Sequence, residues 1–213
     1  MLISLFIIFH LSGFMSIFSV RKRKRAGRGD MYVTHLINPV WNDSSTILIL
    51  GTMPSPQSRA AGFYYMHPQN RFWPVIAAIS GETLHYTNSG TQNTFNSEAN
   101  TALHPDITAA IIERRALVLQ QGIALWDVLA GCDIDGAEDA SIRNPVPNDF
   151  TEIISSAHIR HIYTTGQTAY RYYIKLCEEK TGIPAVCLPS TSPANRGRWP
   201  LDKLIAVYRE IRQ

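Results

Sequence analysis

The chain has 213 residues, of which 45% are hydrophobic and 17% are charged. This composition is typical of a globular protein with room for one ordinary α/β domain. The net charge of +3 hints at an anionic partner, but the run RKRKR at 21–25 supplies much of it, so local basic residues matter more than the total. There are three cysteines, too few for a zinc or iron–sulfur site with four cysteine ligands within one chain, and none of them forms a C-x-x-C pair.

Residues 1–30 differ in composition from the rest of the chain. Residues 2–20 are apolar and, if helical, are long enough to span a bilayer. The basic run follows this stretch instead of preceding it, which disfavours a secretory signal and leaves a signal anchor open. We favour the alternative that translation starts at Met31, so that residues 31–213 form a single domain of a cytoplasmic protein.

The first part of this domain combines one short apolar run with two polar stretches. Residues 46–51, TILILG, end at a glycine and predict a buried strand. Residues 52–70 contain glycine, proline, serine and aromatic residues, so we expect a long loop, followed by a helix over 71–80. Residues 82–104 are rich in Thr, Asn, Ser and Gly, which predicts a polar surface loop or a disordered insert.

The middle of the chain predicts two helices and one strand. Apolar residues recur at helical spacing over 106–121, and residues 122–128, GIALWDV, form a second apolar run that predicts a strand. Residues 131–148 are rich in Gly, Asp, Pro and Asn and are expected to form a loop. A helix is expected over 149–157, because Asp149 and a glutamate three residues later resemble a capping box.

The C-terminal part repeats the alternation of strand and helix. Residues 159–166 and 183–190 predict two further strands, with a helix between them and a last helix from about Trp199. Cys187 lies in the second of these strands, in AVCL, where an apolar filler is favoured over a nucleophile. Strands that alternate with helices predict an α/β fold with a mostly parallel sheet covered on both faces.

Ligands of such sheets bind beyond the carboxyl ends of the strands, where four polar loops are expected to meet. The loops MPSPQS and LPSTSPAN offer hydroxyl and backbone N–H groups, and ANRGR adds two guanidinium groups, all suited to phosphate oxygens. The segment GFYYMHPQNRFW supplies aromatic rings that could stack on a base. A nucleotide or nucleic-acid ligand is indicated, while the P-loop, G-x-G-x-x-G, G-x-S-x-G and H-E-x-x-H motifs are missing.

Three of these motifs resemble the uracil-DNA glycosylase superfamily: GTMPS at 51–55, GFYYMHPQNRFW at 62–73 and LPSTSPAN at 188–195. The H-P-x-N-R-F-W element is similar to that of mismatch-specific uracil-DNA glycosylases. The forms GTMPSPQSR, GIALWDVL and IRNPVPNDF resemble the hypoxanthine-DNA glycosylase branch, and the resemblance covers about residues 38–212.

The resemblance implies a monomeric three-layer α/β/α enzyme that flips a deaminated base out of double- or single-stranded DNA and hydrolyses its N-glycosidic bond. It implies no cofactor, no metal and no obligate protein partner. Hypoxanthine is the expected base. The alternatives are a uracil or thymine mismatch glycosylase, a small-nucleotide hydrolase, and a lesion-binding protein without catalysis.

The resemblance also assigns roles to residues. Met53 stands where several relatives hold an Asp or Asn that handles the water, and a thioether cannot do this. Asn70 is therefore the candidate catalytic residue that orients a water, although it could also cap the helix beginning at Arg71; His67 is a second candidate. The base pocket is expected to contain Gly51, Met53, Tyr65 as the stacking ring and Asp127 as a reader of a purine N–H. The expected DNA phosphate and groove contacts are Ser55, Ser190, Thr191, Ser192, Asn195, Arg196 and Arg198; Arg198 could instead pair with an acidic side chain.

Overall fold

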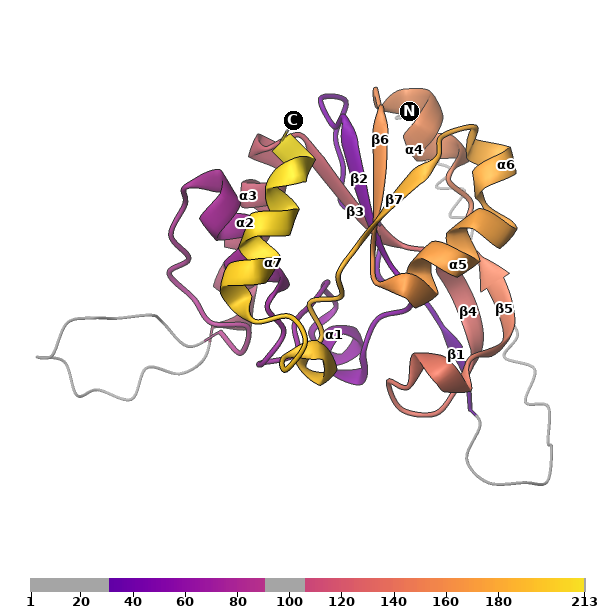
Figure 1. Ribbon diagram of the computed structural model, residues 1–213, viewed down its shortest axis with the longest axis horizontal. Helices are drawn as coiled ribbons and strands as arrows, with labels where there is room; N and C mark the ends of the chain where they lie inside the picture. The colour runs from indigo at the N-terminus through magenta and orange to yellow at the C-terminus, as the bar shows by residue number, and fades with distance from the viewer. Residues whose placement is uncertain (1–30, 91–105, 213) are drawn as a thin grey trace, which may run out of the picture.

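A parallel sheet of four strands forms the centre of the protein (Figure 1). The structure, a computed structural model, describes residues 31–90 and 106–212. The strands are β2 (Ile47–Gly51), β3 (Ile123–Asp127), β6 (His161–Thr165) and β7 (Ala185–Leu188), in the order β3-β2-β6-β7. All three neighbouring pairs run parallel, so the predicted strands and their parallel arrangement are confirmed.

The two faces of this sheet bury separate apolar clusters. Ile49 and Leu125 belong to one cluster, whereas Leu48, Leu50 and Ala124 belong to the other. Because successive side chains of a strand point to opposite faces, a strand buried on both sides is apolar throughout. This explains why the sequence shows continuous apolar runs without alternation.

Helices cover both faces, and the expected three-layer α/β/α fold is confirmed (Figure 1). Residues of one group of helices lie in the cluster with Ile49, and residues of the other group lie in the cluster with Leu48. The first group is α2 (Phe72–Ser80), α3 (Ile107–Gln120) and α7 (Leu201–Tyr208), which continues as a short 3-10 helix, η3 (Arg209–Arg212). The second group is α4 (Thr151–Ser156) and α5 (Gln167–Leu176), and the short α6 (Glu178–Thr181) follows α5.

A second sheet replaces the loop expected over 131–148, and that expectation is wrong. The antiparallel strands β4 (Leu129–Ile134) and β5 (Arg143–Pro147) flank a short 3-10 helix, η1 (Asp139–Ser141). Strand β1 (Met31–Thr34) pairs with β4 from about a hundred residues away, giving the order β1-β4-β5. The strand β5 contains two prolines, which cannot donate a backbone hydrogen bond to a neighbouring strand. They are tolerated because β5 lies at the edge of the sheet, where one side needs no such donor.

One other loop expectation also needs correction. Residues 52–70 contain the short helix α1 (Pro56–Ala61), which Ser55 caps and which Gly62 ends in the left-handed region. In the expected surface loop, Asn88 is buried, so the part of this loop up to residue 90 is anchored in the protein. The leader 1–30 and residues 91–104 lie outside the described residues. Within the described ranges, no helix combines the length and apolar character needed to cross a membrane.

Candidate functional site

A pocket of about 150 Å³ lies at the carboxyl ends of β2, β3 and β6. This is the edge where parallel sheets bind their ligands. It brings together all four residues predicted for the base pocket, together with the predicted serines and Asn70. Its lining consists of Gly51, Thr52, Met53, Pro54, Ser55, Ser58, Tyr64, Tyr65, Asn70, Asp127, Ile134, Ala137, Asp139, Thr165, Ser190, Thr191 and Ser192.

A larger cavity of about 350 Å³ lies at the opposite end of the sheet, beside Thr46, Arg160 and His161. None of the predicted site residues lines it. We therefore place the candidate site in the smaller pocket, where the chemically useful side chains converge.

Asp127 closes the end of this pocket at the tip of β3. The side chains of Asp127 and His35 are almost fully buried, and Nε2 of His35 lies 2.9 Å from Oδ2 of Asp127. The other oxygen, Oδ1, lies against Gly51, where an added Cβ would come within 2.1 Å of it. Gly51 is thus needed for close approach of the carboxyl group, and the histidine fixes the carboxyl orientation.

Tyr65 forms a wall of the pocket in an unusual backbone conformation. Its φ of 56° lies in the left-handed region, which is uncommon for a residue other than glycine. Its ring stacks on Phe72 with centroids 3.8 Å apart, and its hydroxyl lies 3.2 Å from Oγ1 of Thr165. Burial, and after it the negative charge of Asp127, raise the pKa of Tyr65, so the hydroxyl stays protonated at neutral pH.

The side-chain oxygen of Asn70 accepts two hydrogen bonds. The backbone N–H of Phe72 donates at 2.9 Å, and the hydroxyl of Thr191 donates at 2.9 Å. The first bond reaches the first N–H of α2, but the N-cap position itself is Arg71, so Asn70 supports the start of the helix from the residue before the cap. Both lone pairs of the oxygen are then used, which leaves the Nδ2 amino group as the part of Asn70 that can meet a ligand.

Met53 and Asp139 complete the pocket from the other side. Met53 lines the pocket and packs against the cluster on the second face of the sheet. The hydroxyl of Thr52 donates to Asp139 at 3.1 Å. Asp139 is exposed as a residue, but burial of its inward carboxyl group raises its pKa above the ordinary value. The pocket therefore combines an apolar wall with two carboxyl groups.

Comparisons with known proteins identify the family of this chain. A family model described as the uracil DNA glycosylase superfamily matches residues 39–213. The chain belongs to this superfamily. A solution NMR structure of a candidate uracil DNA glycosylase from Methanosarcina acetivorans is 27% identical, with a TM-score of 0.62, and the match covers 86% of this chain and all of that one.

Two curated relatives of this superfamily member are both named hypoxanthine DNA glycosylase. The protein from Methanosarcina acetivorans is 28% identical over 158 residues, which cover 74% of this chain and 85% of the relative. The protein from Methanosarcina barkeri is 29% identical over 159 residues, with the same coverage of both chains. Both matches span most of the relative.

The predicted phosphate-contacting serines line the pocket of this glycosylase-superfamily protein and also organise its loops. Ser55 accepts a bond from the N–H of Ser58 at the start of α1. Ser190 accepts from the N–H of Ser192, and Ser192 accepts from the N–H of Ala194. Thr191 is different, since it is 1% exposed and its hydroxyl points to Asn70. This position suits the alignment of Asn70 better than contact with a phosphate.

The remaining predicted contacts, Asn195, Arg196 and Arg198, follow the pocket along the chain and do not line it. Both arginines are exposed. No ion pair of Arg198 with an acidic side chain is present within residues 31–90 and 106–212. The loop that carries these residues is held by Arg71, which donates to the carbonyls of Thr191, Ser192 and Trp199.

Several contributors to the site were not predicted. His35, Thr52, Arg71, Asp139 and Thr165 come from separate parts of the chain, and only Thr52 and Arg71 lie within a recognised motif. His35 and Asp139 carry no spacing signal, because their neighbours in space are about ninety residues away along the chain. Among the described residues, no cluster of three or more His, Cys, Asp or Glu side chains could hold a metal ion.

Cys187 is half-buried beside Gln167, and burial raises the pKa of its thiol. A raised pKa keeps the thiol in its neutral, weakly nucleophilic form. The interpretation of Cys187 as a filler residue agrees with this environment.

Proposed function

We propose that this protein is a monofunctional DNA glycosylase that flips hypoxanthine out of DNA and releases it by hydrolysis, as the first step of base excision repair. The observation that carries the proposal is membership of the superfamily together with two similar proteins named hypoxanthine DNA glycosylase. We further propose that it acts as a monomer on DNA in the cytoplasm, without a cofactor or a metal.

The pocket chemistry supports binding of a flat purine. The Tyr65 ring, already stacked on Phe72 through one face, offers an aromatic surface, and Met53 offers a soft apolar one. A carboxylate accepts hydrogen bonds, so Asp127 suits the N1–H of hypoxanthine. Because His35 holds Oδ2 of Asp127, Oδ1 beside Gly51 is the oxygen available for this contact.

The reaction requires a water molecule to attack C1′ as the bond to N9 breaks. The electron pair of the broken bond leaves with N9 of the base. The water oxygen becomes the new C1′ hydroxyl, the proton that it loses goes to solvent, and the departing base anion takes up one proton from solvent. Since the transition state resembles an oxocarbenium ion, the electrophile is reactive enough that placing the water matters more than deprotonating it. We assign this placement to Asn70, whose Nδ2 can donate to the water oxygen while Thr191 and Phe72 hold Oδ1.

The DNA backbone would lie along the serines and arginines beside the pocket. Ser55, Ser190 and Ser192 are half-buried at its rim, and Asn195, Arg196 and Arg198 follow on one loop. Hydroxyl and guanidinium groups are good phosphate partners, and the exposed arginines add the electrostatic part of DNA affinity. We assign Thr191 to the positioning of Asn70 instead of to a phosphate.

The test is base release from a panel of duplexes and single strands, each with one hypoxanthine, xanthine, uracil or mismatched thymine. The proposal expects hypoxanthine to be released fastest by the chain starting at Met31. Cleavage of uracil DNA with hypoxanthine DNA untouched would establish the uracil alternative. Binding of lesion DNA without release of any base would establish the non-catalytic alternative, which Met53 motivates. Activity on free deoxyinosine but not on DNA would indicate a small-nucleotide hydrolase.

A further inference from the structure

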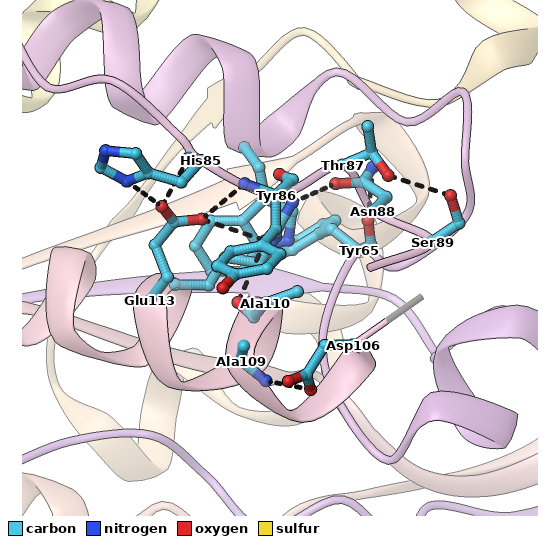
Figure 2. A network of polar contacts seen from close by, with 12 residues as sticks. Tyr65, His85, Tyr86, Thr87, Asn88, Ser89, Asp106, Ala109, Ala110 and Glu113 are labelled. Carbon is cyan, nitrogen blue, oxygen red and sulfur yellow. Dashed lines mark hydrogen bonds and ion pairs between the residues drawn. The ribbon is translucent and has the colours of Figure 1, made fainter. Parts of the chain in front are cut away.

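A buried asparagine outside the pocket holds the loop that carries Tyr65 and Asn70. Asn88 lies in the segment after α2 and is 7% exposed. Its Nδ2 donates to the carbonyl of His67 at 2.9 Å and to that of Asn70 at 3.1 Å. The same nitrogen lies 3.4 Å from the carbonyl oxygen of Tyr65 (Figure 2). One side chain therefore binds the backbone of the site loop, defined as residues 65–71, at three points.

A buried arginine fixes the orientation of this asparagine. Arg114 on α3 is 1% exposed, and its Nη2 donates to Oδ1 of Asn88 and to the carbonyl of Tyr86, each at 3.0 Å. Arginine can only donate, so the oxygen of Asn88 must face Arg114 and its amino group must face the site loop. The guanidinium group also donates to the carbonyl of Ala110 and lies 5.6 Å from the centre of the Trp73 ring.

The arrangement keeps a charge buried in the protein. Burial lowers the pKa of Arg114 to about 10, and Glu113, 3.6 Å away, opposes this decrease. The guanidinium group is thus charged at neutral pH, and hydrogen bonds to a charged group are the stronger kind. Glu113 meanwhile accepts from the backbone N–H groups of His85 and Tyr86, which holds the segment before Asn88 (Figure 2).

The site loop has few hydrogen bonds of its own. Within it, the N–H of Asn70 donates to the carbonyl of His67 and the N–H of Gln69 donates to Nδ1 of His67, while Tyr65 holds its unfavourable φ of 56°. A non-glycine residue in this conformation costs free energy and persists only when its surroundings hold it. Asn88 contacts the carbonyl of Tyr65 itself, and the carbonyls of His67 and Asn70 on the way to α2.

We propose that Asn88 and Arg114 are positioning residues for base release, which set the site loop so that the Tyr65 ring and the Asn70 amide are correctly placed. The inference rests on the proposed glycosylase function and extends its machinery from the pocket to α3. Neither residue lines the pocket, so their effect passes through the backbone of the site loop.

The central variant is Asn88→Asp, which keeps the size and the bond from Arg114 but replaces the donating amino group with an oxygen. That oxygen faces backbone carbonyls and repels them. We expect the single-turnover rate of hypoxanthine release to fall by about ten- to hundredfold, the loss that a misplaced catalytic group can cause. The Kd for lesion DNA should change little, and amide hydrogen exchange of Met66, Asn70 and Arg71 should accelerate.

Two further variants complete the set. Arg114→Lys keeps the charge but lacks the planar fork that serves Tyr86 and Asn88 together, so an intermediate loss of rate is expected. Glu113→Gln is the matched control, because Glu113 neighbours Arg114 and holds the His85–Tyr86 segment without touching the site loop. It should lower Tm while leaving the rate and the exchange of site-loop amides unchanged. If Asn88→Asp does not fold, Asn88→Ser, which buries no charge, takes its place.

The outcomes are distinguishable. Wild-type rate and wild-type exchange in Asn88→Asp would overturn the inference, as would a loss of rate that follows Tm equally in Asn88→Asp and Glu113→Gln. If the wild-type protein releases no base from any duplex, the proposed function fails. Hydrogen exchange of the site-loop amides then tests whether Asn88 and Arg114 position this loop. Faster exchange in Asn88→Asp but not in Glu113→Gln supports the inference, and any other pattern overturns it.

Discussion

The hydroxyl of Thr191 donates a 2.9 Å hydrogen bond to the side-chain oxygen of Asn70, although the two residues are 121 positions apart. The bond joins the loop after β7 to the start of α2. It turns the amino group of Asn70, instead of its oxygen, into the group available to a ligand.

Thr191→Val should therefore slow catalysis without abolishing DNA binding. Valine keeps the shape of threonine but cannot donate, so one partner of the Asn70 oxygen is lost, a change of roughly 0.5–1.5 kcal/mol for a neutral hydrogen bond. We expect a several-fold lower rate of base release and an unchanged Kd for lesion DNA. Thr191→Ser is the control, since it keeps the hydroxyl group. Weaker DNA binding at an unchanged rate would instead restore the phosphate-contact role.

Substitution of Asn70 separates its two roles. Asn70→Ser retains an oxygen that can accept from the N–H of Phe72, whereas Asn70→Ala does not, and loss of a hydrogen bond costs roughly 0.5–1.5 kcal/mol. We expect both variants to lose base release by about a hundredfold or more, because neither can place the water. Only Asn70→Ala should also lose stability in urea unfolding. A fully active Asn70→Ser variant would show that Asn70 serves the helix alone.

Gly51→Ala should disrupt the base pocket. The new Cβ would lie 2.1 Å from Oδ1 of Asp127, so the carboxyl group must shift and leave its place beside His35. Overpacking of this kind costs about 1–3 kcal/mol, and base release should fall with it. The matched control is Gly197→Ala, where nothing lies within 4 Å of an added Cβ. Rates and melting temperatures of both variants test this, and an active Gly51→Ala variant would contradict it.

Arg196→Gln and Arg198→Gln should weaken DNA binding uniformly across sequences. Each exposed guanidinium group that contacts a phosphate releases counterions, so each substitution should reduce the slope of log K against log salt by about one. Arg160→Gln, at the opposite end of the sheet, is the control and should leave the slope unchanged. Fluorescence anisotropy over a salt series gives the slopes. Equal slopes for wild type and the Arg196 and Arg198 variants would remove these residues from the interface.

Asp149 should stabilise the protein only above its titration range. Its carboxylate accepts bonds from the N–H and hydroxyl of Thr151 at the start of α4, and these bonds lower its pKa below the ordinary 3.8. A lowered folded-state pKa gives stability that is present above 3.8 and is lost as the pH falls through the folded-state value. Asp149→Ala should therefore lower Tm at neutral pH, and the difference from wild type should shrink in acid. Asp149→Asn, which keeps an acceptor oxygen, should show a smaller loss; a difference in Tm independent of pH would contradict this assignment.

Much of the fold follows from local patterns. The strands β2, β3, β6 and β7 are apolar runs that end in turn residues, and the long helices show their spacing in the sequence. The sheet β1-β4-β5 could not be predicted in this way. Its strands contain glycine, aspartate and proline, and they exist because β1 supplies hydrogen-bond partners to β4 from a distant part of the chain.

The sequence by itself determined the α/β class, the family resemblance and the segments that form the pocket, because each of these rests on a contiguous run of residues. Only the tertiary structure decided the contacts between the segments: His35 with Asp127, Thr191 with Asn70, and Asn88 with the carbonyls of the site loop. These pairs are far apart along the chain, and a hydrogen bond depends on where the folded backbone places its donor and acceptor. A motif can thus name Asn70, while the fold decides which of its atoms is available to a ligand in the pocket.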